Sequence, residues 1–238
     1  GCAAMETVRH NHSFMMDPNA GLGRTTGNPV YEDQMEGVAL WAKGRSVILF
    51  NAILDAEHRF LKMFAGDYIE AHHEACKFVD EVYGVKIPAQ ADITIASCGG
   101  YPKDINVYQM QKTMDNAVLA TKQGGVVILL ADCEEGSGSK VLEETCRTLK
   151  TADAIEAKLR DRFLIGANKA YAITRLTKKA HFILVTGLDR QLAKDMLFDG
   201  AVDTVEEALE LAKQYVSDDV RYILMPTGSL TVPLYRPE

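Results

Sequence analysis

The sequence predicts an α/β protein in two parts, of which the C-terminal one is a three-layer αβα domain with a mainly parallel sheet. From residue 91 onward, short and continuously apolar runs alternate with longer amphipathic stretches. Such runs are typical of strands that are buried on both faces of a parallel sheet. Upstream of residue 45 the chain is instead rich in Gly, Asn and Pro, which favours loops and short helices.

The N-terminal part is expected to combine helices with one hairpin. A helix over residues 6–16 should end before Pro18, because the residue preceding a proline disfavours helical backbone. Asp67 can cap a helix that runs to Tyr83, where Gly84 can end it. Between these helices we expect a loop at 21–29, a helix at 31–43, and paired strands at 45–54 and 60–65.

A change of pattern marks the boundary between two domains. Residues 85–90 (VKIPAQ) are the best linker candidate. We therefore expect residues 1–88 to complete a larger N-terminal domain, incomplete here, and residues 89–238 to form the C-terminal α/β domain. The strands expected in the C-terminal domain are 93–97, 126–131, 182–186 and 222–225, and the helices are 105–122, 140–149, 152–162, 167–178, 190–198 and 205–216.

Composition argues against several classes of partner. The 238 residues carry a formal net charge of −7, which disfavours broad attraction to nucleic acid or to anionic lipid. No apolar run approaches the length of a membrane span, and the first residues do not read as a signal peptide. The 5 cysteines are odd in number and lack CxxC spacing, so we expect reduced, buried thiols in a cytoplasmic protein.

The segment after the first expected strand has the pattern of a ligand site. The glycine pair at 99–100 lets the backbone turn sharply, and Asp104 can serve as the N-cap of the helix that follows. In a parallel α/β sheet, ligands gather where strands end and helices begin. Side chains that bind a small molecule are therefore expected in the first turns of this helix.

Tyr108, Gln109 and Lys112 are spaced so that they can line one flank of this helix. A phenol, an amide and an ammonium together can hold the hydroxyl and the carboxylate of a small acid. Spacing alone favours a plainer interpretation, in which these are polar residues on the exposed face of an amphipathic helix.

Two longer stretches of sequence favour the ligand-binding interpretation over the exposed helix face. Residues 91–112 read ADITIASCGGYPKDINVYQMQK. They closely resemble the hallmark of the nickel-pincer lactate racemase family, a strand followed by GGYPKDINLYQ and a helix with Lys three residues beyond the Gln. Residues 6–12, ETVRHNH, resemble the ETIxxNH element of the same family. The resemblance covers nearly the whole chain and is strongest at 1–30 and 91–131.

The resemblance implies an isomerase, a nickel-dependent racemase or epimerase of a small 2-hydroxy acid such as lactate. It implies that Tyr108, Gln109 and Lys112 bind the substrate and that His12 is a nickel ligand. An imidazole suits Ni(II), which prefers square-planar sites with nitrogen donors. His10 lies close by in the sequence and remains the alternative ligand.

The family's other catalytic groups are expected outside this chain. Family members carry a PHxxAGFSGGxK segment just before the position of Gly1. Its His is one of two acid/base histidines, and its Lys bears the nicotinate-derived nickel-pincer nucleotide. The second acid/base His lies in an earlier GTHRP-like stretch. We therefore expect a missing N-terminal segment or another chain to supply these groups, and the present chain to be inactive alone.

Other interpretations stay open. The chain could be a non-catalytic family member that is only a binding module, an epimerase for a longer hydroxy acid such as a sugar acid, or an ordinary nucleotide-binding α/β protein. His72, His73 and Cys76 are close in sequence, but a structural zinc site needs a fourth ligand that their neighbourhood lacks. The loop at 136–139 lacks Walker and GxGxxG spacing, so we expect it only to start a helix.

Overall fold

The computed structural model describes residues 3–235, and the chain divides into two compact units, Gly1–Tyr83 and Gly84–Glu238. The segment expected as a linker, residues 85–90, belongs to the second unit. Its beginning lies in strand β3 (Gly84–Lys86), which pairs in parallel with β9 (Val232–Leu234). This partner is far away in the sequence, so the local pattern could not reveal the strand.

The helices at the start of the first unit are tied together by a buried amide. The side chain of Asn11 donates hydrogen bonds to the carbonyl oxygen of Val30 at 2.8 Å and to the carboxylate of Asp33 at 2.9 Å. Where one helix was expected, a helix and a short 3-10 turn follow each other. The helix is α1 (Met5–Ser13) and the 3-10 turn is Phe14–Met16. The next helix along the chain is α2 (Pro29–Ala42).

The expected hairpin of the first unit is confirmed. Strand β1 (Leu49–Leu54) pairs antiparallel with β2 (Phe60–Gly66), and α3 (Glu70–Tyr83) packs against both strands. The carboxylate of Asp67 accepts hydrogen bonds from the first amides of α3, as its position before the helix predicts.

The second unit contains the expected parallel sheet. Five strands lie in the order β7-β6-β5-β4-β8, and every neighbouring pair is parallel. Strand β7 was not expected, because its three residues are too few to show an apolar run. The strands are β4 (Ala91–Ser97), β5 (Thr121–Leu130), β6 (His181–Val185), β7 (Gly200–Val202) and β8 (Tyr222–Met225).

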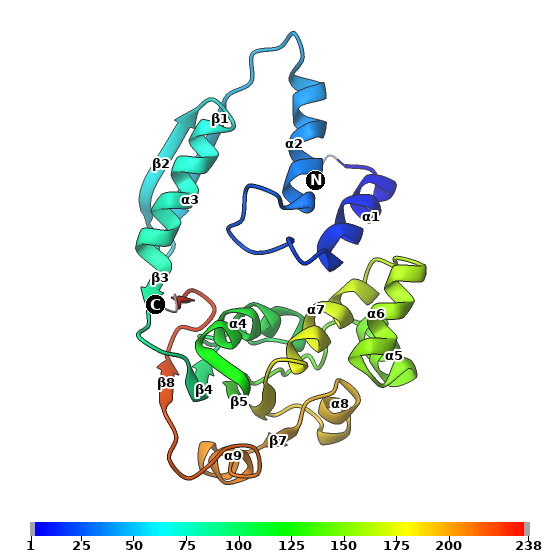
Figure 1. The fold of residues 1–238 in the computed structure, drawn as a ribbon, viewed down its shortest axis with the longest axis vertical. Helices are drawn as coiled ribbons and strands as arrows, with labels where there is room; N and C mark the ends of the chain where they lie inside the picture. Colours follow the sequence, from blue (N-terminus) through cyan, green and yellow to red (C-terminus); the bar gives the residue numbers. More distant parts are fainter. Residues whose placement is uncertain (1–2, 236–238) are drawn as a thin grey trace. The chain divides into compact units, whose positions relative to one another are not determined.

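Helices cover both faces of this sheet and give the three layers of the second unit (Figure 1). On one face α4 packs against β4 and β5, and α7 packs against α4; on the other face α9 packs against β5, β6 and β7. None of the described helices is long and apolar enough to cross a membrane. The helices are α4 (Val107–Ala120), α5 (Lys140–Leu149), α6 (Ala152–Asp161), α7 (Ala167–Thr177), α8 (Arg190–Asp195) and α9 (Val205–Ala212).

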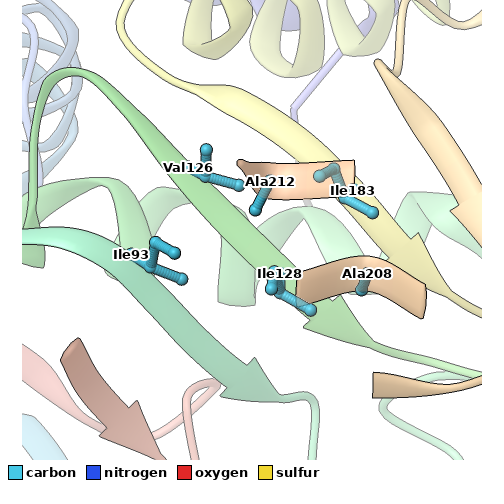
Figure 2. Packing of buried hydrophobic residues seen from close by; sticks show 6 residues of the cluster. All are labelled: Ile93, Val126, Ile128, Ile183, Ala208 and Ala212. Atoms are coloured by element: carbon cyan, nitrogen blue, oxygen red, sulfur yellow. The ribbon is translucent and has the colours of Figure 1, made fainter. Parts of the chain in front are cut away.

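Branched apolar side chains form the core between the sheet and α9 (Figure 2). The strands contribute residues that are at most 2% exposed, and α9 contributes two fully buried alanines, whose small size lets the helix approach the sheet closely. Each buried branched side chain contributes roughly 1.5–3 kcal/mol to folding. The cluster comprises Ile93, Val126, Ile128, Ile183, Ala208 and Ala212.

Candidate anion-binding site

The start of helix α4 is held in place by its cap. The buried side chain of Asn106 accepts a hydrogen bond from the backbone amide of Gln109 at 3.0 Å and donates one to Glu135 at 3.3 Å. Gly138 lies directly against this side chain, since a β-carbon there would lie 2.5 Å from Asn106 Cγ. A larger residue at this position would displace the cap, so the glycine fixes where α4 begins.

Asp104 was expected to cap this helix, and that prediction is wrong because Asn106 is the cap. The backbone carbonyl oxygens of Asp104 and Ile105 accept hydrogen bonds from the amides of Cys133 and Glu135, both at 2.9 Å. These bonds bind the two residues to the loop that follows β5 and keep them outside the helix.

Gln109 and Lys112, two of the expected substrate-binding residues, meet on α4. Lys112 Nζ donates a hydrogen bond to Gln109 Oε1 at 3.0 Å. Because its oxygen is engaged, the amide of Gln109 presents its NH2 group as a donor to a ligand. Lys112 is exposed and forms no ion pair within residues 3–235, so its charge is not neutralised by a described carboxylate.

A pocket of about 350 Å³ opens beside this pair of residues. Its wall includes two ammonium groups and an amide, and no acidic side chain lines it. Arg or Lys side chains in such a setting bind carboxylates through charge-assisted hydrogen bonds. The pocket is therefore suited to a small anion. It is lined by Pro102, Lys103, Ile105, Gln109, Lys112, Ser229 and Leu230.

Tyr108, the third expected residue, contacts helix α7 and does not line this pocket. Its ring centroid lies 4.1 Å from Lys169 Nζ, which is a cation–π distance. Lys169 also donates a hydrogen bond to Gln111 Oε1 at 2.6 Å. Lys169 was not among the expected site residues, because 58 positions separate it from Gln111 and no local pattern links the two helices.

A charged network continues from Lys169 along the interface of α4 and α7. Arg175 donates a hydrogen bond to Asp115 at 2.7 Å, and the Gln111 amide binds the same carboxylate. Burial raises the pKa of Asp115, and the cations Arg175 and Lys169 oppose this shift. Burial lowers the pKa of Lys169; Asp115 opposes this shift and the ammonium of Lys112 adds to it. Lys112 and Lys169 thus lie close enough for their charges to interact.

His12, the expected nickel ligand, lies in the last turn of α1 in the first unit. Its imidazole is exposed and has no hydrogen bond, ion pair or ring contact with any described residue. His10 instead lies 3.8 Å from the Asp33 carboxylate and packs edge-on against Phe14. A metal could thus bind His12 without breaking a contact, although within residues 3–235 no group of three or more His, Cys, Asp or Glu is placed to hold one.

The described cysteines are free thiols suited to packing. Burial raises the pKa to about 11 for Cys98 and to about 12 for Cys133 and Cys146, so these groups stay protonated at neutral pH. Cys76 is partly buried, with Sγ 3.7 Å from His72 Nε2, and burial raises its pKa as well. Cys2 lies outside the described residues.

The fold and the pocket define an α/β protein that can bind a small anion beside its parallel sheet. The first strand of a parallel sheet leads through a glycine turn into a helix that carries a basic pocket without acidic side chains. The family model of the lactate racemase C-terminal domain matches residues 86–232. The chain therefore belongs to the lactate racemase family.

Known relatives extend this similarity to most of the chain. The chain is 31% identical over 235 residues to the lactate racemase of Thermoanaerobacterium thermosaccharolyticum. The matched residues make up 96% of this chain and 54% of that relative. The chain is 29% identical over 236 residues to the lactate racemase of Lactiplantibacillus plantarum, with the same coverage of 96% and 54%. The chain thus spans about half the length of the curated relatives that it matches.

Solved structures agree with the sequence relatives. The lactate racemase apoprotein of T. thermosaccharolyticum gives a TM-score of 0.87 at 29% identity, over 96% of this chain and 55% of that structure. A Thermotoga maritima protein gives a TM-score of 0.63 at 13% identity, over 88% of this chain and 54% of that structure. The second likeness shows a shared fold alone.

The cap of α4 gives a prediction that separates local from global effects. Asn106→Ala should lower the free energy of unfolding by about 1 kcal/mol and should speed hydrogen exchange of the Gln109 amide, which loses its side-chain acceptor and keeps only the backbone carbonyl oxygen of residue 106. Ser139→Ala removes the cap of α5 and is the matched control, with a similar loss of stability. Equal protection of the Gln109 amide in both variants would contradict the role of Asn106.

Proposed function

We propose that this chain provides the substrate-binding part of a nickel-dependent racemase or epimerase that acts on a small 2-hydroxy acid such as lactate. The observation that carries the proposal is the pairing of Gln109 and Lys112, which lie in the family's motif, at 3.0 Å beside a pocket without acidic side chains. Membership in the lactate racemase family supports the reaction type.

The proposed role of these residues is to hold the acid in one orientation. The Lys112 ammonium binds the carboxylate, and the free NH2 group of Gln109 donates to the carboxylate or to the 2-hydroxyl. Tyr108 belongs to the same motif, but its ring lies against Lys169 and outside this pocket, so the ligand contacts proposed for the pocket are those of Lys112 and Gln109. Fixing the acid in this way places its carbinol carbon for reaction and lowers the entropic part of the barrier.

Inversion at the carbinol carbon also needs groups that we do not assign to this chain. A proton acceptor is required on each face of the carbon, and in the family these are two histidines outside the motifs found here. When bound, the nickel-pincer nucleotide supplies the hydride acceptor. The imidazole of His12, whose side chain has no partner among residues 3–235, fits the role of one nickel ligand, since a nitrogen donor suits Ni(II).

Substitution of Lys112 tests the proposed function. In the 238-residue chain, Lys112→Met should weaken binding of L-lactate about tenfold or more, because a charge-assisted hydrogen bond is lost. Affinity is measured by NMR titration of amide resonances at constant ionic strength. Lys194→Met is the matched control, since Lys194 is exposed on α8 and forms no ion pair with described residues. Equal affinities of the two variants would refute the assignment.

Nickel retention tests the role of His12. In a protein that carries the pincer nucleotide and nickel, His12→Ala should lower the nickel content after gel filtration, because the nitrogen donor that would hold the metal is lost. Elemental analysis gives the readout, and His10→Ala serves as the control. Loss of nickel in the His10 variant alone would transfer the role to His10.

The last test of this proposal concerns the chain by itself. We expect no racemisation by the 238-residue chain, because residues that act as a unit lose nearly the whole rate when some are absent. The chain is incubated with nickel, added cofactor and one enantiomer of lactate, and the optical rotation is followed. Racemisation above the protein-free background would show that the missing groups are not needed.

A further inference from the structure

We propose that Ser229 and Lys103 complete the acid-binding pocket, with the Ser229 hydroxyl donating a hydrogen bond to the carboxylate and Lys103 supplying a second positive charge. This inference rests on the proposed function and extends it to residues outside helix α4. Both side chains line the same pocket as Gln109 and Lys112.

The hydroxyl of Ser229 lacks a partner. Its Oγ is buried and forms no hydrogen bond with any described residue. Buried hydroxyl groups in folded proteins are nearly always paired, and an exception calls for an explanation such as a ligand. Because Ser229 lines the pocket, a bound carboxylate would give this hydroxyl the acceptor that the protein does not provide.

The residue before Ser229 is fixed by two hydrogen bonds of its backbone. The Gly228 amide donates to the carbonyl oxygen of Ser97 at 2.9 Å, and its own carbonyl oxygen accepts from the Asn116 side chain at 2.8 Å. A β-carbon at Gly228 would lie 2.7 Å from the Thr113 methyl carbon, so this glycine allows the turn to approach α4. The backbone that carries Ser229 is therefore held in position before a ligand arrives, which lowers the cost of binding.

Lys103 lies next to Ser229 at the glycine turn after β4. A β-carbon at Gly99 would lie 3.9 Å from Lys103 Nζ and also 3.9 Å from Ser229 Oγ. The ammonium and the hydroxyl therefore both lie close to Gly99. The side chain of Lys103 forms no hydrogen bond or ion pair within residues 3–235, and the neighbouring residue Asp104 lines a different hollow at the ends of the strands. Its charge is therefore available to an anion in the pocket.

The rest of the lining limits the class of ligand. Ile105, Leu230 and Pro102 are apolar and can contact the side chain of the acid, while the charged and polar groups contact its carboxylate. Two ammonium groups, a hydroxyl donor and an amide donor match the acceptors of one carboxylate and its 2-hydroxyl. The class of ligand inferred is a small 2-hydroxy monocarboxylic acid.

Ser229→Ala distinguishes a binding role from a structural one. Binding of L-lactate by the 238-residue chain should weaken about three- to tenfold, as for loss of one hydrogen bond to a charged group. The Tm should not fall, because the variant removes a buried hydroxyl that has no partner in the free protein. Ser217→Ala, at an exposed position, is the control for both measurements. A lower Tm with unchanged affinity would overturn the proposal.

Lys103→Met should weaken binding of L-lactate about tenfold, with Lys194→Met as the control. If Lys112→Met abolishes binding while Lys103→Met and Ser229→Ala bind as wild type does, this inference fails and the proposed function stands. If none of the three variants changes the affinity, the proposed function fails with it. Tighter binding of a dicarboxylic acid such as malate that depends on Lys103 would also overturn the inferred class of ligand.

Discussion

Helix α4 begins where the side chain of Asn106 lies between Gly138 and the backbone amide of Gln109, and the pocket depends on this contact. The cap fixes both the first residue of the helix and its rotation about its axis. Gln109 and Lys112, in the first two turns, take their directions from it. The loop after β5 holds the residues before the cap as well, through the amides of Cys133 and Glu135. The packing of Gly138 against Asn106 and the hydrogen bonds from the loop after β5 together place the amide of Gln109 and the ammonium of Lys112.

The charges around α4 are arranged so that one face of the helix stays positive. Asp115 lies between Arg175 and Lys169 at the contact with α7, where it is paired. Lys112 and Lys103 face the pocket without such a partner among the described residues. In the low dielectric of a partly enclosed pocket, unpaired cations attract an anion more strongly than they would in bulk water. Recognition of a small acid thus needs no net positive charge on the protein, whose formal net charge is −7.

Much of the fold could be predicted because its signals are local. Continuous apolar runs predicted β4, β5, β6 and β8, and the hairpin of the first unit followed from its two strands and polar turn. β7 and β9 were missed, since three residues carry no periodicity and β9 is recognised only through its pairing with β3. Asp104 was expected as the cap and Asn106 is the cap found; both are good capping residues, and only contacts from the distant loop after β5 decide between them.

The residues of the candidate site also differ in whether a local sequence signal indicates them. Tyr108, Gln109 and Lys112 lie in one recognisable motif, so the sequence could propose them together, although their role remains a prediction. Lys169 and Ser229 belong to no such motif. They reach α4 only through the packing of α7 and through the turn after β8, and that information is not contained in any short segment.

The pairing of β3 with β9 has a consequence for how the second unit is assembled. These are the first and last strands of the unit, and their contact closes a loop that contains almost all of it. Contacts between such distant segments form late, because the entropy of closing the loop must be overcome before they stabilise anything. The turn that carries Ser229 lies just before β9. During folding, the part of the pocket wall that carries Ser229 is therefore expected to take its place late, together with the pairing of β9 with β3.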